Sequence, residues 1–270
     1  MLVIGFPAQA FATNCYILAP DSGEECVIVD PGIGVVDQLD AVLRDQRLKP
    51  AAVLLTHGHL DHIYSVTPVC GTRDVPAYIH KDDEYRLKDP ISTLDPALVT
   101  MLEHQFGTAA MWAEPDDVIV LTDGASLPIA GLDLTVDHAP GHTEGSVMFR
   151  LPATDGPRAP EAPNVISRDL RRASGGRPRA PEAPNVISRD LRRASAGSPL
   201  CLSGDVLFAG SIGRTDLPGG DHAAMQRSLA TRVLPLADET RVLPGHGPAT
   251  TIGQERASNP YLQGLGSPTT

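Results

Sequence analysis

The stretch from Val53 to His62 constrains this chain more than any other. It reads VLLTHGHLDH, so an apolar run ends in three histidines and an aspartate within six positions. A buried strand has no structural use for four such side chains at its end. A metal ion does, because it needs several deprotonated nitrogen and oxygen donors held on one rigid support. The stretch therefore predicts part of a metal site, and later segments must supply the remaining donors.

Three later strands also end in metal-capable side chains. A strand expected at 132–137 leads into PGHTEG, where proline and glycine fix the turn around His142. The apolar run from 199 delivers Asp205, and a carboxylate can bridge two cations. A last strand, 240–243, ends in PGHG and delivers His246. The chain thus offers enough donors for a complete site.

Other histidines and one aspartate have less specific surroundings. His80 and His104 lack ligand-like neighbours and are expected to be ordinary surface or capping residues, while His138 is expected in or under its strand. Asp30 follows a strand at a turn, which leaves two interpretations: a turn cap, or a carboxylate that orients a metal-bound histidine.

Strand and helix patterns alternate along the chain. We expect an amphipathic helix at 35–48 closed by Pro50, a helix beginning within 60–70, an acidic and loosely helical stretch at 81–107, and a helix capped by Asp221. The remaining expected strands are 1–6, 14–19, 25–29, 51–55, 75–79, 117–121, 125–129 and 199–205.

One segment interrupts this pattern. Residues 157–174 read PRAPEAPNVISRDLRRAS, and residues 178–195 repeat them letter for letter. Two copies are too few for a repeat array, so we interpret the segment as a tandem duplication. Its composition predicts a dispensable surface loop with at most a helical turn in each copy. The 270 residues are therefore expected to form a single domain, interrupted by an insertion at about 157–199.

Charge and composition narrow the partners. The chain carries a net charge of −11, although residues 157–199 hold nine arginines against four acidic residues. So acidic a body repels phosphate backbones, which disfavours a nucleic-acid substrate. No apolar run approaches the roughly 18 residues of a membrane span. The apolar start lacks a basic region, and the four cysteines form no CxxC pair, so we expect a cytoplasmic protein with reduced core thiols.

The motifs THGHLDH, PGHTEG, SGD and PGHG, in that order, resemble the metallo-β-lactamase superfamily, and its short glyoxalase II-like branch in particular. The resemblance implies an αββα sandwich of two mixed sheets flanked by helices. It also implies two divalent metals, zinc first with iron or manganese as alternatives. His57, His59 and His142 would bind the first metal; Asp61, His62 and His246 would bind the second. Asp205 would bridge the two.

The implied activity is hydrolysis of a thioester by a metal-bound hydroxide that Asp61 orients, as in hydroxyacylglutathione hydrolases. Arg214, in a GRTDL loop, is a candidate to bind a substrate carboxylate, although an Arg–Asp pair that braces the loop is an equal interpretation. Only 24 residues follow His246, so we expect no glutathione-binding helical domain. Asp205 also disfavours a β-lactamase of the kind with Cys there. The alternative is a persulfide dioxygenase with one iron.

Overall fold

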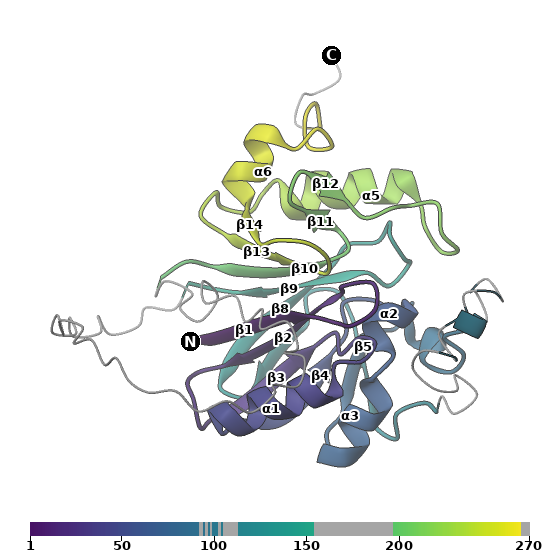
Figure 1. Ribbon diagram of the computed structural model, residues 1–270. Coiled ribbons are helices and arrows are strands. Elements are labelled where there is room, and N and C mark those ends of the chain that lie inside the picture. Colours follow the sequence, from purple (N-terminus) through teal and green to yellow (C-terminus); the bar gives the residue numbers. More distant parts are fainter. Residues whose placement is uncertain are drawn as a thin grey trace, which may run out of the picture.

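The computed structural model describes residues 1–91, 113–153 and 197–265, together with 94, 97, 99–101 and 104. These residues form two six-stranded sheets that lie face to face, with helices on both outer sides (Figure 1). The expected αββα sandwich is confirmed. The duplicated segment 157–195, with its expected helical turns, lies outside the described residues, as does most of the acidic stretch beyond residue 91.

The first sheet has the strand order β1-β2-β3-β4-β5-β6. Its strands are β1 (Leu2–Pro7), β2 (Asn14–Ala19), β3 (Glu25–Val29), β4 (Lys49–Leu54), β5 (Ala77–His80) and β6 (Val118–Leu121). β1 to β3 pair antiparallel, whereas β3 to β6 are parallel. Because parallel strands end at the same edge of a sheet, Asp30 after β3 and His57 after β4 are brought together.

The second sheet has the order β14-β13-β10-β9-β8-β7. Its strands are β7 (Ser126–Ile129), β8 (Leu132–His138), β9 (Val147–Leu151), β10 (Leu200–Gly204), β13 (Arg241–Pro244) and β14 (Thr250–Thr251); β11 (Leu207–Phe208) and β12 (Ser211–Ile212) form a separate hairpin. β10 and β13 are parallel, and β9 is antiparallel to β10. The loop before β9 and the ends of β10 and β13 therefore share one edge, which brings together His142, Asp205 and His246.

Helices cover the outer faces of both sheets (Figure 1). The first sheet carries α1 (Val36–Gln46), α2 (Leu60–Ile63) and α3 (Val66–Arg73); the second carries α5 (His222–Ser228), the π-helical segment η3 (Leu229–Val233) and α6 (Ile252–Ser258); the short 3-10 helix η1 (Glu84–Leu87) follows β5. As expected, Asp221 caps α5, since its carboxylate accepts a hydrogen bond from the backbone N–H of Ala224 at 3.0 Å.

Successive side chains of a strand point to opposite faces of its sheet and so pack in different hydrophobic clusters. In β3, Cys26 and Ile28 pack in the cluster that also holds α1 and α3, while Val27 and Val29 pack in the cluster between the two sheets. A third cluster, which includes Met225 of α5, lies under the helices of the second sheet. Because each large aliphatic side chain contributes about 1.5–3 kcal/mol when fully buried, these clusters hold the edge that carries the donors rigidly.

Of three local expectations, two were wrong and one was confirmed in part. The first helix ends at Gln46, because Arg47 adopts a left-handed φ of 56°, and Pro50 lies inside β4 instead of closing the helix. The helix expected to begin within 60–70 does begin there, at Leu60 with Asp61 in its first turn, although a break separates α2 from α3. His80 is buried, not a surface residue, because the end of β8 covers it, and its ring stacks on that of His138 at 4.0 Å.

All four cysteines are buried and free of disulfide bonds. Within the described part of the chain, no helix has both the length and the apolar character to span a bilayer.

Candidate metal centre

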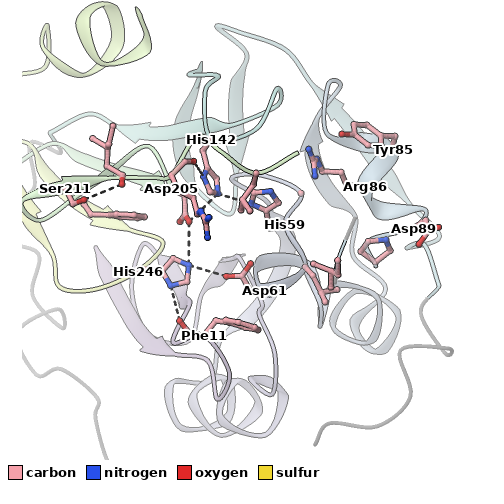
Figure 2. Close-up of a pocket in the computed structure, with 18 residues that line it drawn as sticks. Phe11, His59, Asp61, Tyr85, Arg86, Asp89, His142, Asp205, Ser211 and His246 are labelled. Atoms are coloured by element: carbon pink, nitrogen blue, oxygen red, sulfur yellow. Dashed lines mark hydrogen bonds and ion pairs between the residues drawn. The ribbon is translucent and has the colours of Figure 1, made fainter. Parts of the chain in front are cut away.

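All seven residues expected as ligands lie at one edge of the sandwich. His57 and His59 follow β4, Asp61 and His62 begin α2, and His142 precedes β9; Asp205 and His246 follow β10 and β13. Figure 2 shows five of them, His59, Asp61, His142, Asp205 and His246, gathered around a common centre. The structure thus brings together donors that are up to 189 positions apart in the sequence.

Two groups of three donors are distinct within this cluster. His57, His59 and His142 form the first donor group, and Asp61, His62 and His246 form the second; within each group the ligand atoms lie within 4.8 Å of one another. The tightest approach in the first group is 2.8 Å, between His59 Nδ1 and His142 Nε2. In the second, Asp61 Oδ2 lies 3.2 Å from His246 Nε2.

Asp205 lies between the two groups. Its Oδ1 is 3.4 Å from His62 Nε2, and its Oδ2 is 3.5 Å from His142 Nε2 and 3.6 Å from His246 Nε2. One carboxylate therefore faces a histidine of the first group and two of the second. This is the placement that a bridging ligand requires.

The orientation of the histidines fits a metal. The outer nitrogens meet oxygen acceptors: His62 Nδ1 donates to Asp30 at 2.9 Å, His142 Nδ1 to the Arg214 carbonyl at 2.7 Å, and His246 Nδ1 to the Phe11 carbonyl at 3.1 Å. With the hydrogen on the outer nitrogen, each inner Nε2 presents a lone pair to the centre, which is the arrangement found in metal-ligating histidines.

Two buried atoms at the centre lack any hydrogen-bond partner, His57 Nε2 and Asp205 Oδ1. Leaving a buried acceptor unsatisfied costs about 1–3 kcal/mol, more for a charged group, so such atoms call for an explanation. Cations bound to the two donor groups would satisfy both atoms. On this observation the residues present fit the metals that the motif predicts.

The pKa shifts of the histidines differ between the two donor groups. Burial, then the neighbouring histidines, holds the pKa of His57 well below its ordinary value, and burial together with His142 lowers the pKa of His59 to about 3. Burial would also lower the pKa of His62 and of His246, but the surrounding carboxylates raise both. Burial would raise the pKa of Asp61, yet His62 and His246 lower it. The pKa values of these two histidines of the first group are therefore lowered, whereas the carboxylates raise the pKa values of the two histidines of the second group.

Asp30 contacts His62 directly, which matches the second of its two interpretations. Its side chain is buried and also accepts hydrogen bonds from Thr56, at 2.8 Å from the backbone N–H and 2.7 Å from the hydroxyl. The carboxylate therefore holds the imidazole of His62 and the chain just before His57 in fixed positions.

Two supporting residues were not predicted. Thr13 donates a hydrogen bond to Asp61 Oδ2 at 2.8 Å across 48 positions of sequence. Asp83, fully buried, accepts from Gly58 and from the loop after His142. Neither residue has a local sequence signal, because both act through contacts between distant segments.

A cavity of about 560 Å³ opens over the centre. Its walls are largely apolar and include Phe11, Leu60, Phe208 and Ile212, while five of the seven ligand candidates also line it. In Figure 2, Tyr85, Arg86 and Asp89 lie on one side of the donors and Ser211 on the other.

Arg214 lines this cavity, and it also forms the bracing pair that the sequence left open. Its guanidinium makes two hydrogen bonds of 2.7 Å to Asp216, and both side chains are exposed.

A family model for the metallo-β-lactamase superfamily matches residues 8–156. The chain belongs to the metallo-β-lactamase superfamily. Among curated relatives, an uncharacterized protein from Mycobacterium tuberculosis is 40% identical over 267 residues, covering 98% of this chain and 99% of its own. The hydroxyacylglutathione hydrolase GloC of Haemophilus influenzae is 28% identical over 256 residues, covering 95% of both chains.

Solved structures of the superfamily agree with this assignment. The BLEG-1 B3 metallo-β-lactamase is 34% identical with a TM-score of 0.67, covering 97% of this chain and 100% of its own. TTHA1623, solved in a di-iron-bound form, is 31% identical with a TM-score of 0.64, covering 96% and 99%.

Proposed function

We propose that this protein is a dinuclear metal hydrolase that cleaves a thioester, such as the S-acyl conjugate of glutathione or of another small thiol. One observation carries the proposal: two donor groups meet at Asp205, which lines a cavity with apolar walls. The likeness to GloC, whose name states hydroxyacylglutathione hydrolysis, supports the thioester class.

We assign His57, His59 and His142 to the first metal, the second donor group to the second, and Asp205 to both. Imidazole and carboxylate donors suit zinc, iron and manganese. Zinc is our first choice, and the di-iron form of TTHA1623 supports iron as an alternative. When bound, two such cations supply Lewis acidity and lower the pKa of a shared water, so that a nucleophile exists near neutral pH.

The chain's own residues then have separate roles. Asp61, kept ionised by its lowered pKa and held by Thr13, is placed to orient the nucleophile as well as to bind the second metal. The apolar walls exclude water around the acyl group and favour attack on its carbonyl carbon. A thiolate leaves readily, which suits a site with no separate acid assigned to the leaving group.

Arg214 is our candidate for binding a carboxylate of the thiol carrier. The role requires the substrate to replace Asp216 as its partner. Since the existing pair is exposed to solvent, the exchange is inexpensive.

β-Lactam hydrolysis is a second candidate, because BLEG-1 is 34% identical and is named as a β-lactamase. The same nucleophile would attack an amide carbonyl in that case.

A substrate panel separates these proposals. The purified protein, with its metal content measured, is assayed with S-D-lactoylglutathione, with a chromogenic β-lactam, and with a thiol persulfide under an oxygen electrode. We expect steady thioester turnover from protein that holds close to two metals per chain. Absence of thioesterase activity with any thiol conjugate would refute the leading proposal. Oxygen uptake by protein holding one iron would establish the dioxygenase alternative.

A further inference from the structure

We propose that Asp83 and Arg86 form a buried positioning pair that sets the first donor group. The pair lies at the 3-10 helix η1, outside every sequence motif of the site. The inference rests on the proposed metal ligation by His57, His59 and His142.

Asp83 joins the two loops that carry the first group. Its Oδ2 accepts hydrogen bonds from the backbone N–H of Gly58 at 2.8 Å and from the hydroxyl of Thr143 at 2.7 Å. Its Oδ1 accepts from the backbone N–H of Gly145 at 3.0 Å. Gly58 lies between two of the donor histidines. Thr143 directly follows the third, His142, and Gly145 lies three positions after it. One fully buried carboxylate therefore fixes the spacing of both loops.

The packing around the pair is equally tight. A Cβ on Gly58 would lie 2.6 Å from Cδ of Arg86, and a Cβ on Gly145 would lie 2.6 Å from Cβ, Cγ and the backbone nitrogen of Asp83. Each ligand loop thus turns a glycine toward the pair, at a distance that no side chain would allow. This contact is independent of the hydrogen bonds and confines the same two loops.

Arg86 extends the arrangement to a third loop. Its guanidinium is buried, and its Nε lies 3.3 Å from Asp83 Oδ1. Its Nη2 donates to Glu144 and to the carbonyl of Pro218, both at 3.0 Å. The loop around Pro218 also supplies the Arg214 carbonyl that receives the outer N–H of the His142 ring. The pair therefore sets the position of the His142 loop and of the loop that orients its ring.

The second donor group is supported by different residues. Asp30 holds His62, Thr13 holds Asp61, and the carbonyl of Phe11 holds His246. Loss of Asp83 should therefore weaken one metal position and spare the other, whereas a merely structural role would weaken both alike.

The experiment titrates metal-free protein with Co²⁺ and follows both affinity and the visible absorption of the bound ion. For Asp83→Asn we expect one equivalent to bind at least about tenfold more weakly with an altered spectrum, while the other equivalent binds as in the wild type. In an Asp61→Ala background, which keeps only the first group, Asp83→Asn should remove the remaining tight equivalent.

Two further variants complete the design. Asp82→Asn changes the neighbouring carboxylate in the same way. This carboxylate is half-buried and lies against His80 and His138 instead of the donor loops, so the change should leave both affinities unchanged. Thr143→Val removes one of the three hydrogen bonds to Asp83 and should weaken binding of the same metal equivalent to a smaller extent. If Asp83→Asn does not fold, this variant tests the positioning role.

Unchanged binding, or an equal loss at both positions, would overturn the positioning role. Wild-type protein that binds fewer than two equivalents would instead contradict the dinuclear proposal, whatever the variants show.

Discussion

Replacing Asp30 by asparagine removes a buried negative charge beneath His62 while keeping the size of the side chain. Asp30 has a left-handed φ of 49°, a conformation that asparagine tolerates, so the change adds little backbone strain. The amide oxygen can still accept from the backbone N–H of Thr56. The amide NH₂, however, would face the Nδ1–H of His62, which places two donors against each other.

The expected effect follows from that conflict. The imidazole must move its hydrogen to Nε2, which then no longer offers a lone pair to the second cation. A hydrogen bond to a charged group is worth about 1.5–3 kcal/mol. At 1.4 kcal/mol for each factor of ten, this predicts a loss of about 10- to 100-fold in affinity for the second metal. The affinity of the first donor group should fall less, because Asp30 reaches that group only indirectly, through Thr56.

A competition titration against a chromophoric chelator measures both affinities. Asp74→Asn is the matched control, because Asp74 has nearly the same left-handed φ, 54°, on an exposed turn away from the centre. Asp30→Asn with two wild-type affinities would refute the view that Asp30 orients His62. So would an equal loss at both positions.

Other predictions concern Asp61, the pH dependence of metal binding, the Arg214–Asp216 pair and the insertion. Asp61→Ala should retain one tightly bound metal and lose thioester hydrolysis; metal analysis and the assay with S-D-lactoylglutathione test this. Because carboxylates raise the pKa of His62, a cation must displace the proton of this residue. The affinity for the second metal should therefore fall when the pH is lowered from about 8 to about 6, and the affinity for the first metal should change less. Metal titrations at the two pH values test this. Asp216→Asn should free Arg214 and lower KM for a thioester that carries a carboxylate, with kcat unchanged in steady-state kinetics; an unchanged KM would contradict a substrate role. Deleting residues 157–195 should leave metal content and activity near those of the full chain, as for a single domain with a dispensable insertion; collapse of either would refute this.

The ligand candidates could be found from the sequence because each follows a strand and stands beside a glycine, a proline or another donor. At these strand ends, a periodic apolar pattern is followed by polar side chains that are seldom buried in a hydrophobic core. The apolar pattern predicted most of the strands and the helices α1 and α5 for the same reason, since apolar spacing is local information. The arrangement of the strands in two sheets was implied by the resemblance to the superfamily.

Supporting residues could not be found in this way. Asp83 is one acidic residue in an acidic stretch, and only the approach of two distant loops makes it an acceptor for both. The burial of His80 is likewise decided by His138, which lies 58 positions later. The role of Asp30 stayed open for the same reason, because its partner His62 follows 32 positions on.

The most direct test of the dinuclear proposal follows thioester hydrolysis while metal-free protein is titrated with Zn²⁺. If both donor groups act together through Asp205, activity should stay low through the first equivalent and rise with the second, ending at two metals per chain. Full activity at one equivalent, with no further gain at the second, would contradict the proposal and favour a single-metal centre.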